Sequence, residues 1–245
     1  MKRIGVFGVV AVLVAAVLAF SFSMRAQPKP LTLTFLAEAD GEPVVFDEFA
    51  YTNPGGNERI RLRDFRVYIS NIVLFDGDVQ HVVNDSYHLL RFDRRTPEFS
   101  VVLPDVPLRR ISKISMSIGI DEAANGSIET RGDLDPNNRM AWNWSIGYKF
   151  VLLEGAIELD SSVAPLVYHV GFNENRRDIV FSASNRIEWA EDEPLKFKVD
   201  PLQLFSGAEA INLANLQTVK MDRSDAALLS ANYATMIQAD WAAAQ

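Results

Sequence analysis

Short stretches of β-forming residues, separated by turn residues, recur along most of this sequence. They include "LTLTFLAEADG", "LRDFRVYISNIVLFDG", "YHLLRFD", "FSVVLPD", "ISKISMSIGID", "PLVYHVGF", "RDIVFSAS" and "PLKFKVD". Dipeptides typical of turns, such as Asp40-Gly41, Asp76-Gly77 and Asn125-Gly126, fall between them. Strands at this spacing, with no amphipathic helix between them, predict an antiparallel β-sandwich rather than an α/β fold.

The C-terminal region has a different pattern. From Asp222 onward, apolar residues recur with a period near 3.6, namely Leu229, Tyr233, Met236, Ile237 and Trp241. This pattern predicts a helix of about five turns, capped by Asp222 or Ser224, with Trp241 anchoring it on the sandwich. The stretch "PLQLFSGAEAINL" predicts a short helical turn before it. The expected fold class is therefore mainly β: an antiparallel β-sandwich with a C-terminal α-helix.

The N-terminal segment reads as a targeting sequence. Lys2 and Arg3 precede an apolar run from Ile4 to Met24, which is the arrangement of a secretory signal and is also long enough to cross a bilayer. We therefore expect residues 1–30 to be a signal peptide or an N-terminal membrane anchor, with cleavage near Ala26 favoured. Residues 31–245 then form a single periplasmic or otherwise extracytoplasmic domain, which touches a membrane only through the N-terminal segment.

Composition excludes several classes of function. The formal net charge of −8 argues against a nucleic-acid partner. The chain has no cysteine, so disulfides, thiolate metal sites and thiol catalysis are ruled out. The sequence contains neither a G-x-S-x-G elbow nor a phosphate-binding glycine loop. Since no set of acid, base and nucleophile can be named, we expect a protein that is not an enzyme.

The stretch "RMAWNWSIGYKF", residues 139–150, holds two of the four tryptophans. Read as one strand, it places Trp142, Trp144 and Tyr148 on the same face, together with Met140, Ile146 and Phe150. A stripe of this kind is usually core. Whether these two indoles only pack or also take part in chemistry is therefore the main question that the sequence raises.

The turn "GDLDPNN" carries oxygen ligands at alternate positions. Asp133, Asp135 and Asn137 match the first, third and fifth positions of a calcium-binding loop. The sixth position, Asn138, is not glycine, and the twelfth, Trp144, is not an acid. An ordinary Asp/Asn/Pro turn is therefore favoured over a calcium site at Asp133 and Asp135.

Two of the three histidines lie inside strand-like runs, each after a tyrosine. His88 is expected to share a face with Leu90 and Phe92, and His169 to share a face with Val167 and Gly171, where Gly171 leaves space beside the imidazole. The two imidazoles would form a metal site if they met at the sandwich rim, because imidazole suits copper, zinc and nickel. The alternative is two half-buried histidines without a metal. The third histidine, His81, is expected in a surface loop.

Several of these stretches together resemble the MbnP-like periplasmic proteins, which are found near methanobactin operons and are related in theme to MopE and CorA. They are "FRVYISNIVLF", "YHLL", "SIGID", "GDLDPNNRMAWNWSIGYKFVLLEG" and "YHVGF". The resemblance extends from about Leu31 to the C-terminal helix and is most specific over residues 134–155.

The resemblance implies copper handling outside the cytoplasm. It implies that copper is held by two histidines and by kynurenine, which a dihaem peroxidase-like partner makes by oxidising a tryptophan of the W-x-W motif. Carried onto this chain, Trp142 and Trp144 become candidates for that oxidation, with Trp144 preferred, and His88 and His169 become candidate copper ligands. An indole N–H only donates a hydrogen bond, whereas kynurenine offers lone pairs. The alternatives are a metal-free, tethered β-sandwich that serves interaction or structure, and a calcium-stabilised module.

Overall fold

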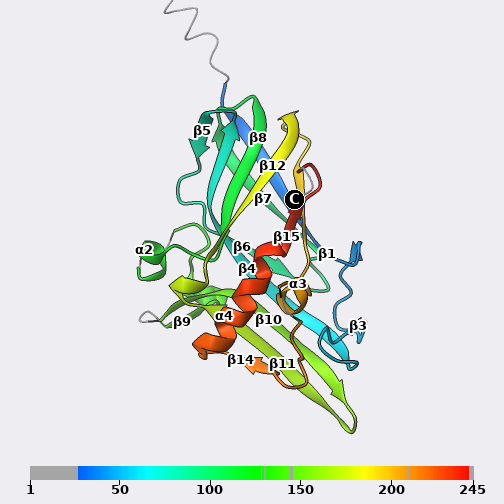
Figure 1. Cartoon of the computed structure of the whole chain (residues 1–245). Helices are drawn as coiled ribbons and strands as arrows, with labels where there is room; N and C mark the ends of the chain where they lie inside the picture. The colour runs from blue at the N-terminus through cyan, green and yellow to red at the C-terminus, as the bar shows by residue number, and fades with distance from the viewer. Residues whose placement is uncertain (1–26, 128, 130, 144–145, 209, 243–245) are drawn as a thin grey trace, which may run out of the picture.

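The computed structural model describes residues 27–127, 129, 131–143, 146–208 and 210–242. The protein is mainly β, with 53% of the described residues in strands and 13% in helices, which confirms the predicted fold class. The strands of the described chain form two sheets (Figure 1). Residues 1–26 of the expected signal peptide or anchor lie outside the described residues. Within the described ranges, no helix is both long and apolar enough to cross a membrane.

The smaller sheet is mixed rather than purely antiparallel. Its strands are β1 (Lys29–Ala39), β2 (Glu42–Pro43), β7 (Glu98–Val106), β13 (Leu195–Val199) and β15 (Ile237–Ala239). β1 pairs antiparallel with β7 and parallel with β13. Leu31, Leu33 and Phe35, at alternate positions of β1, are fully buried.

The larger sheet has the order β12-β8-β4-β10-β11-β14, with shorter strands attached. Its strands are β3 (Tyr51–Thr52), β4 (Arg59–Asp76), β5 (Val79–Val82), β6 (His88–Phe92), β8 (Arg110–Ile118), β9 (Ala141–Asn143), β10 (Gly147–Leu159), β11 (Ser162–Gly171), β12 (Arg177–Glu188) and β14 (Thr218–Val219). β11 and β14 are parallel, so this sheet is also mixed.

The long strand β4 organises this sheet. Val67 pairs with residues of both β10 and β6, while Ile69 pairs with residues of both β8 and β6. Because a strand residue has one neighbour on each side, β8 and β10 must share one edge of β4, and β6 lies along the other. The register shifts between Ser70 and Val73, where Asn71 has a positive φ of 55°.

Both faces of this sheet are covered near the middle of β4. On the inner face, Val67, Ile69 and Val151 belong to the main core between the sheets. On the outer face, Tyr68 and Leu152 belong to a second apolar cluster. That cluster is completed by the segment between β8 and β10, which contains the helices α2 (Glu122–Asn125) and η1 (Pro136–Asn138). Burial on both faces explains why "VYISNIVLF" and "FVLL" are apolar at almost every position.

The C-terminal helix is shorter than the predicted five turns. The helix α4 (Arg223–Asn232) begins as expected, with the Asp222 carboxylate accepting a hydrogen bond from the backbone N–H of Asp225 at 2.9 Å. It is followed by η3 (Tyr233–Thr235) and by β15, which pairs antiparallel with β13. Strand pairing at the sheet edge therefore overrides the helical periodicity.

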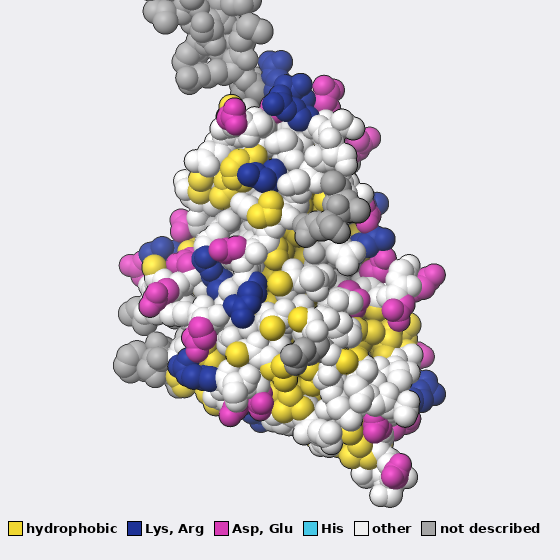
Figure 2. Space-filling model, viewed as in Figure 1, with side chains coloured by type: hydrophobic (Ala, Val, Ile, Leu, Met, Phe, Trp, Pro, Cys, Tyr) yellow, Lys and Arg dark blue, Asp and Glu magenta, His cyan; other side chains and the backbone are white. Residues whose placement is uncertain are grey.

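Trp241 lies beyond the end of the helix and packs on strands β12 and β13. Its ring lies 5.6 Å from that of Phe197 and 6.3 Å from that of Phe181. The expected short helical turn is present as α3 (Gln203–Ser206), and η2 (Asn173–Asn175) follows β11. Figure 2 shows that acidic and basic side chains are interspersed over the face on which α4 lies.

The stretch 139–150 does not form one strand, so the predicted common face is wrong. β9 folds back on β10, with Tyr148 pairing with Ala141 in an antiparallel hairpin. The reversal needs glycine at position 147, where φ is +92° and a Cβ would lie 2.3 Å from Oδ1 of Asn125. Trp142 is thus on β9 while Tyr148 is on β10, and Trp144 lies outside the described residues.

Candidate functional site

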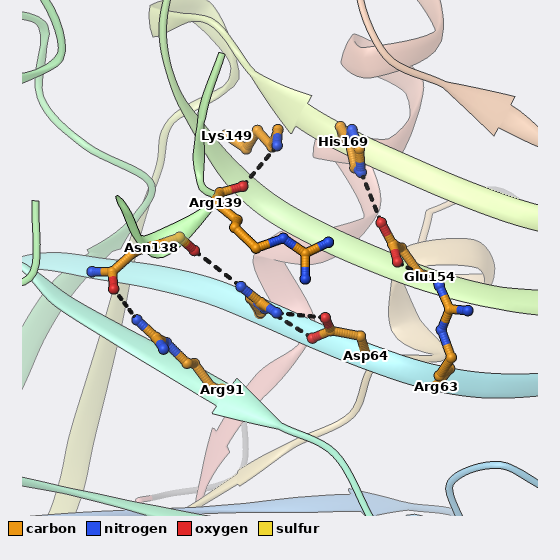
Figure 3. A network of polar contacts seen from close by, with 9 residues as sticks. Arg63, Asp64, Arg91, Asn138, Arg139, Lys149, Glu154 and His169 are labelled. Carbon is orange, nitrogen blue, oxygen red and sulfur yellow. Dashed lines mark hydrogen bonds and ion pairs between the residues drawn. The ribbon is translucent and has the colours of Figure 1, made fainter. Parts of the chain in front are cut away.

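The candidate site lies on the outer face of the larger sheet, where β4, β10 and β11 run side by side (Figure 3). Leu152 of β10 pairs with Arg66 of β4 on one side and with His169 of β11 on the other. Paired residues in a sheet point to the same face, so Arg66 and His169 lie on the outer face with Leu152. Glu154, two residues further along β10, also lies there and pairs with Asp64.

His169 is a half-buried imidazole whose Nε2 atom is buried and has no hydrogen-bond partner among the described residues. Its Nε2 lies 3.5 Å from Oε1 of Glu154, and the two side chains are 14% and 16% exposed. That contact is not a hydrogen bond, so Nε2 has no hydrogen-bond partner within the described residues. Burial, assisted by the charge of Lys149, lowers the pKa of His169 although Glu154 acts in the opposite direction. The imidazole is therefore neutral at neutral pH, which is the state that can bind a metal.

Glu154 is held as a carboxylate. Burial alone would raise its pKa, but the hydrogen bond from Arg63, at 2.6 Å, and the nearby His169 outweigh this and lower the pKa of Glu154. Lys149 is also affected, because burial and the charges of Arg139 and Arg66 lower its pKa. The site thus combines a neutral imidazole, an ionised carboxylate and several cations.

Trp142 packs against Gly171, two positions along β11 from His169. A Cβ at Gly171 would fall 2.6 Å from Cζ3 of Trp142 and 2.5 Å from the backbone oxygen of Tyr148, so the indole rests directly on the backbone of β11. The space that Gly171 leaves is thus filled by this indole and this carbonyl rather than left open beside the imidazole. His169 and Gly171 point to the same side of β11, about 6.6 Å apart. Trp142 therefore packs on the residue that follows His169 on the same side of β11.

The structure does not bring His88 and His169 together. His88 pairs with Ile69 and shares the inner face with Leu90 and Phe92, as predicted for this strand. It is separated from β11 by β4 and β10, so the two histidines are three strand spacings apart, about 14 Å, and on opposite faces. The Nε2 of His88 is also buried without a hydrogen-bond partner, and burial lowers the pKa of His88 although Asp133 opposes this.

The remaining predicted ligands have structural partners. Oδ2 of Asp133 accepts a hydrogen bond from the backbone N–H of Leu89 at 2.8 Å. Oδ1 of Asp135 accepts one from the backbone N–H of Asn137 at 2.8 Å and caps η1. His81 lies on β5 and not in a loop. Among the described residues, no group of three or more His, Cys, Asp or Glu side chains could hold a metal ion. Calcium binding at Asp133 and Asp135 stays a prediction.

Sequence reasoning missed three residues of this face: Lys149, Glu154 and Arg139. Glu154 carried a signal, because it is an acid inside the otherwise apolar run "FVLLEGAI", and a charge on a strand that is buried on both faces needs a partner. Arg139 carried none, since its position depends on the turn after η1, where its φ is +62°.

Comparison with known proteins identifies a family that matches this chain. A family model described as MbnP matches residues 28–222. A solved structure, MbnP from Methylosinus trichosporium, is similar with a TM-score of 0.56 and 20% identity, over 76% of this chain and 80% of that chain. At that identity the likeness shows the fold alone. No curated protein matches the chain.

Proposed function

This chain belongs to the MbnP family, and on that premise we propose that it is a copper-handling protein that binds the metal and is not an enzyme. MbnP is a family of extracytoplasmic type, and membership suggests a methanobactin-associated protein. Residues 1–30 act in this proposal as the signal peptide or anchor that brings the domain out of the cytoplasm. The observation that carries the proposal is the buried Nε2 of His169, which has no hydrogen-bond partner among the described residues, two positions from the Gly171 on which Trp142 packs.

The donor chemistry at His169 fits copper. Copper accepts imidazole nitrogen readily, and the buried Nε2 of His169 is free of hydrogen bonds within the described residues. The carboxylate of Glu154 is the nearest acidic group, at 3.5 Å. As a tryptophan, Trp142 cannot add a ligand, because its indole N–H only donates. As kynurenine it would offer an aniline nitrogen and a carbonyl oxygen next to the imidazole.

Trp142 is therefore the residue that we propose for oxidation to kynurenine. The oxidation would be carried out by a separate, dihaem peroxidase-like maturation enzyme. Trp144, the residue preferred from the sequence, lies outside the described residues, so the choice of Trp142 rests on its contact with Gly171, two positions from His169.

A single copper ion held by both histidines does not fit this arrangement. Metal–nitrogen bonds of about 2 Å require the two donor atoms to lie within about 4 Å of each other, whereas the two strands are about 14 Å apart. The proposed site therefore uses His169 without His88.

Peptide mass spectrometry on the protein from its native cells tests the maturation step. The peptide holding Trp142 and Trp144 is expected to have lost one carbon and gained one oxygen, and fragmentation should place this change on residue 142. The peptides holding Trp189 and Trp241 are internal controls that should stay unmodified. An unmodified 142–144 peptide from cells that express the partner enzyme would contradict the proposal.

A metal-free interaction sandwich is the second candidate. It is favoured by the separation of the two histidines and by the hydrogen bonds that already engage Asp133 and Asp135. Under this alternative, protein purified from native cells contains an unmodified W-x-W peptide and retains no copper above the level of a His169→Ala variant.

A further inference from the structure

Positive charge is concentrated on the outer face around the candidate site, although the whole chain has a net charge of −8. The polar network in Figure 3 contains five cationic side chains, namely Arg63, Arg66, Arg91, Arg139 and Lys149. Its carboxylates are Asp64 and Glu154. Asp93 acts on Arg66 only through space. The local charge balance is thus opposite to that of the molecule.

The two carboxylates are already engaged by two of these cations. Arg66 is bound to Asp64 by two hydrogen bonds, at 2.9 and 2.6 Å. Arg63 donates to Glu154 at 2.6 Å. Among the described residues, this leaves Arg91, Arg139 and Lys149 without a carboxylate partner.

These cations hold a turn whose exposed arginine points over the sheet. Arg66 donates to the backbone oxygen of Asn138 at 3.0 Å, and Arg91 donates to the Asn138 side chain. Nζ of Lys149 donates to the backbone oxygen of Arg139 at 2.8 Å. With the turn fixed in this way, the Arg139 guanidinium extends between Lys149 and Glu154 in the view of Figure 3. The charges of Arg139 and Arg66 both act on Lys149, so the three cations lie near one another. Within the described ranges the Arg139 guanidinium has no hydrogen bond or ion pair.

Like charges that converge in this way repel one another, and an anion placed between them removes that cost. A guanidinium fork presents parallel N–H donors that match the oxygens of a carboxylate or a phosphate, and an ammonium group adds a point charge. We propose that the space bordered by Arg66, Arg139 and Lys149 binds a small oxyanion, the carboxylate or phosphate group of a ligand. This site does not require copper or an oxidised tryptophan.

A titration of copper-free protein tests the proposal. Inorganic phosphate and, separately, acetate are added at an ionic strength held constant with chloride, and the arginine Nε–Hε resonances are followed by NMR. We expect a saturable shift of the Arg139 resonance in the unaltered protein. Tighter binding of phosphate identifies a phosphate group as the ligand chemistry, and tighter binding of acetate identifies a carboxylate.

Three variants make the result specific. Arg139→Gln and Lys149→Gln are expected to weaken binding by about tenfold or more, because each removes a charged hydrogen-bond donor from the site. Their binding is followed on the Arg66 resonance. Arg109→Gln, at an exposed arginine between β7 and β8, makes the same charge change far from the site and should bind like the unaltered protein. Since the Arg139 side chain has no hydrogen bond or ion pair to any described residue, Arg139→Gln tests the site even if Lys149→Gln destabilises the fold.

The proposal is overturned by any of three results. The first is a shift that does not saturate, and the second is an equal shift when chloride replaces the added anion. The third is unchanged affinity in Arg139→Gln.

Discussion

Gly171 determines where the indole of Trp142 can lie. Any side chain at this position would occupy the volume that the ring fills, because the Cβ would come within 2.6 Å of Cζ3. The ring also contacts Phe172, with 5.2 Å between centroids. The proposed proximity of Trp142 and His169 thus depends on glycine, which has no side chain, at position 171.

Gly171→Ala should displace the indole. We expect a loss of about 1–3 kcal/mol in the free energy of unfolding, as is usual for overpacking, together with a red shift of tryptophan fluorescence as Trp142 becomes more exposed. Gly126→Ala is the matched control, since its Cβ would meet nothing closer than the Glu122 backbone oxygen at 3.4 Å. Equal stability of the two variants would contradict the packing described here.

The buried imidazoles make the stability of the protein depend on pH. Burial lowers the pKa of both His88 and His169 below the ordinary value of 6.5. Below pH 6.5 the unfolded chain therefore takes up protons before the folded chain does, so the free energy of unfolding falls as the pH falls from 6.5 towards the folded-state pKa values. Above pH 6.5 these two groups contribute no pH dependence.

His88→Asn should reduce this acid sensitivity. Chemical denaturation at several pH values between 5 and 7.5 measures the slope, and the variant is expected to lose stability less steeply below 6.5 than the unaltered protein, because one such imidazole is gone. His81→Asn, on β5, serves as the control and should keep the original slope. A slope in His88→Asn that matches the control would show that His88 is not buried as described.

At the scale of elements, local sequence predicted the start of the C-terminal helix better than its end. The strand-like run of β1 and the Asp222 cap of α4 were both readable, since each depends on neighbouring residues. The end of α4 was not, because the chain after Asn232 pairs with β13, and a distant strand has no local signal. The β9–β10 hairpin did have a local signal, Gly147. The alternating pattern of residues 139–150 nevertheless led to the prediction of a single strand.

The cap of α4 can be tested directly. Asp222→Ala is expected to lower the free energy of unfolding by about 1 kcal/mol, because the backbone N–H of Asp225 loses its acceptor. Asp222→Asn keeps an oxygen acceptor and should change the stability by only a few tenths of that. Thermal or chemical denaturation compares the two variants. If Asp222→Asn loses as much stability as Asp222→Ala, the side-chain cap is not what stabilises the start of this helix.

A variant in the turn at residues 133–138 tests whether its carboxylates are structural or bind calcium. Asp133→Ala removes the acceptor of the Leu89 N–H and should lower the free energy of unfolding by about 1–3 kcal/mol. We expect the same loss in calcium and in a chelator. A calcium-dependent rise in melting temperature, present in the unaltered protein and absent in the variant, would instead support the calcium-stabilised module.

At the scale of the whole molecule, the order of strands decides which predicted residues meet. The sequence placed His88 correctly on a face with Leu90 and Phe92, yet it contained no information on how many strands separate β6 from β11. β4 and β10 lie between them. His169 is aligned with Arg66 of β4, whereas His88 pairs with Ile69, an odd number of positions away, so the two histidines face opposite sides of one sheet. The same order brings Glu154 and Lys149, to which sequence reasoning gave no role, next to His169.

The central claim is that copper is held on the outer face at His169 and that His88 takes no part. Its most direct test is a competitive copper titration of the matured protein from native cells, comparing His169→Ala, His88→Ala and His81→Ala. We predict that His169→Ala loses copper binding, while His88→Ala and His81→Ala bind like the unaltered protein. Equal loss in His88→Ala and His169→Ala would contradict the account, because one ion would then need both faces of the sheet.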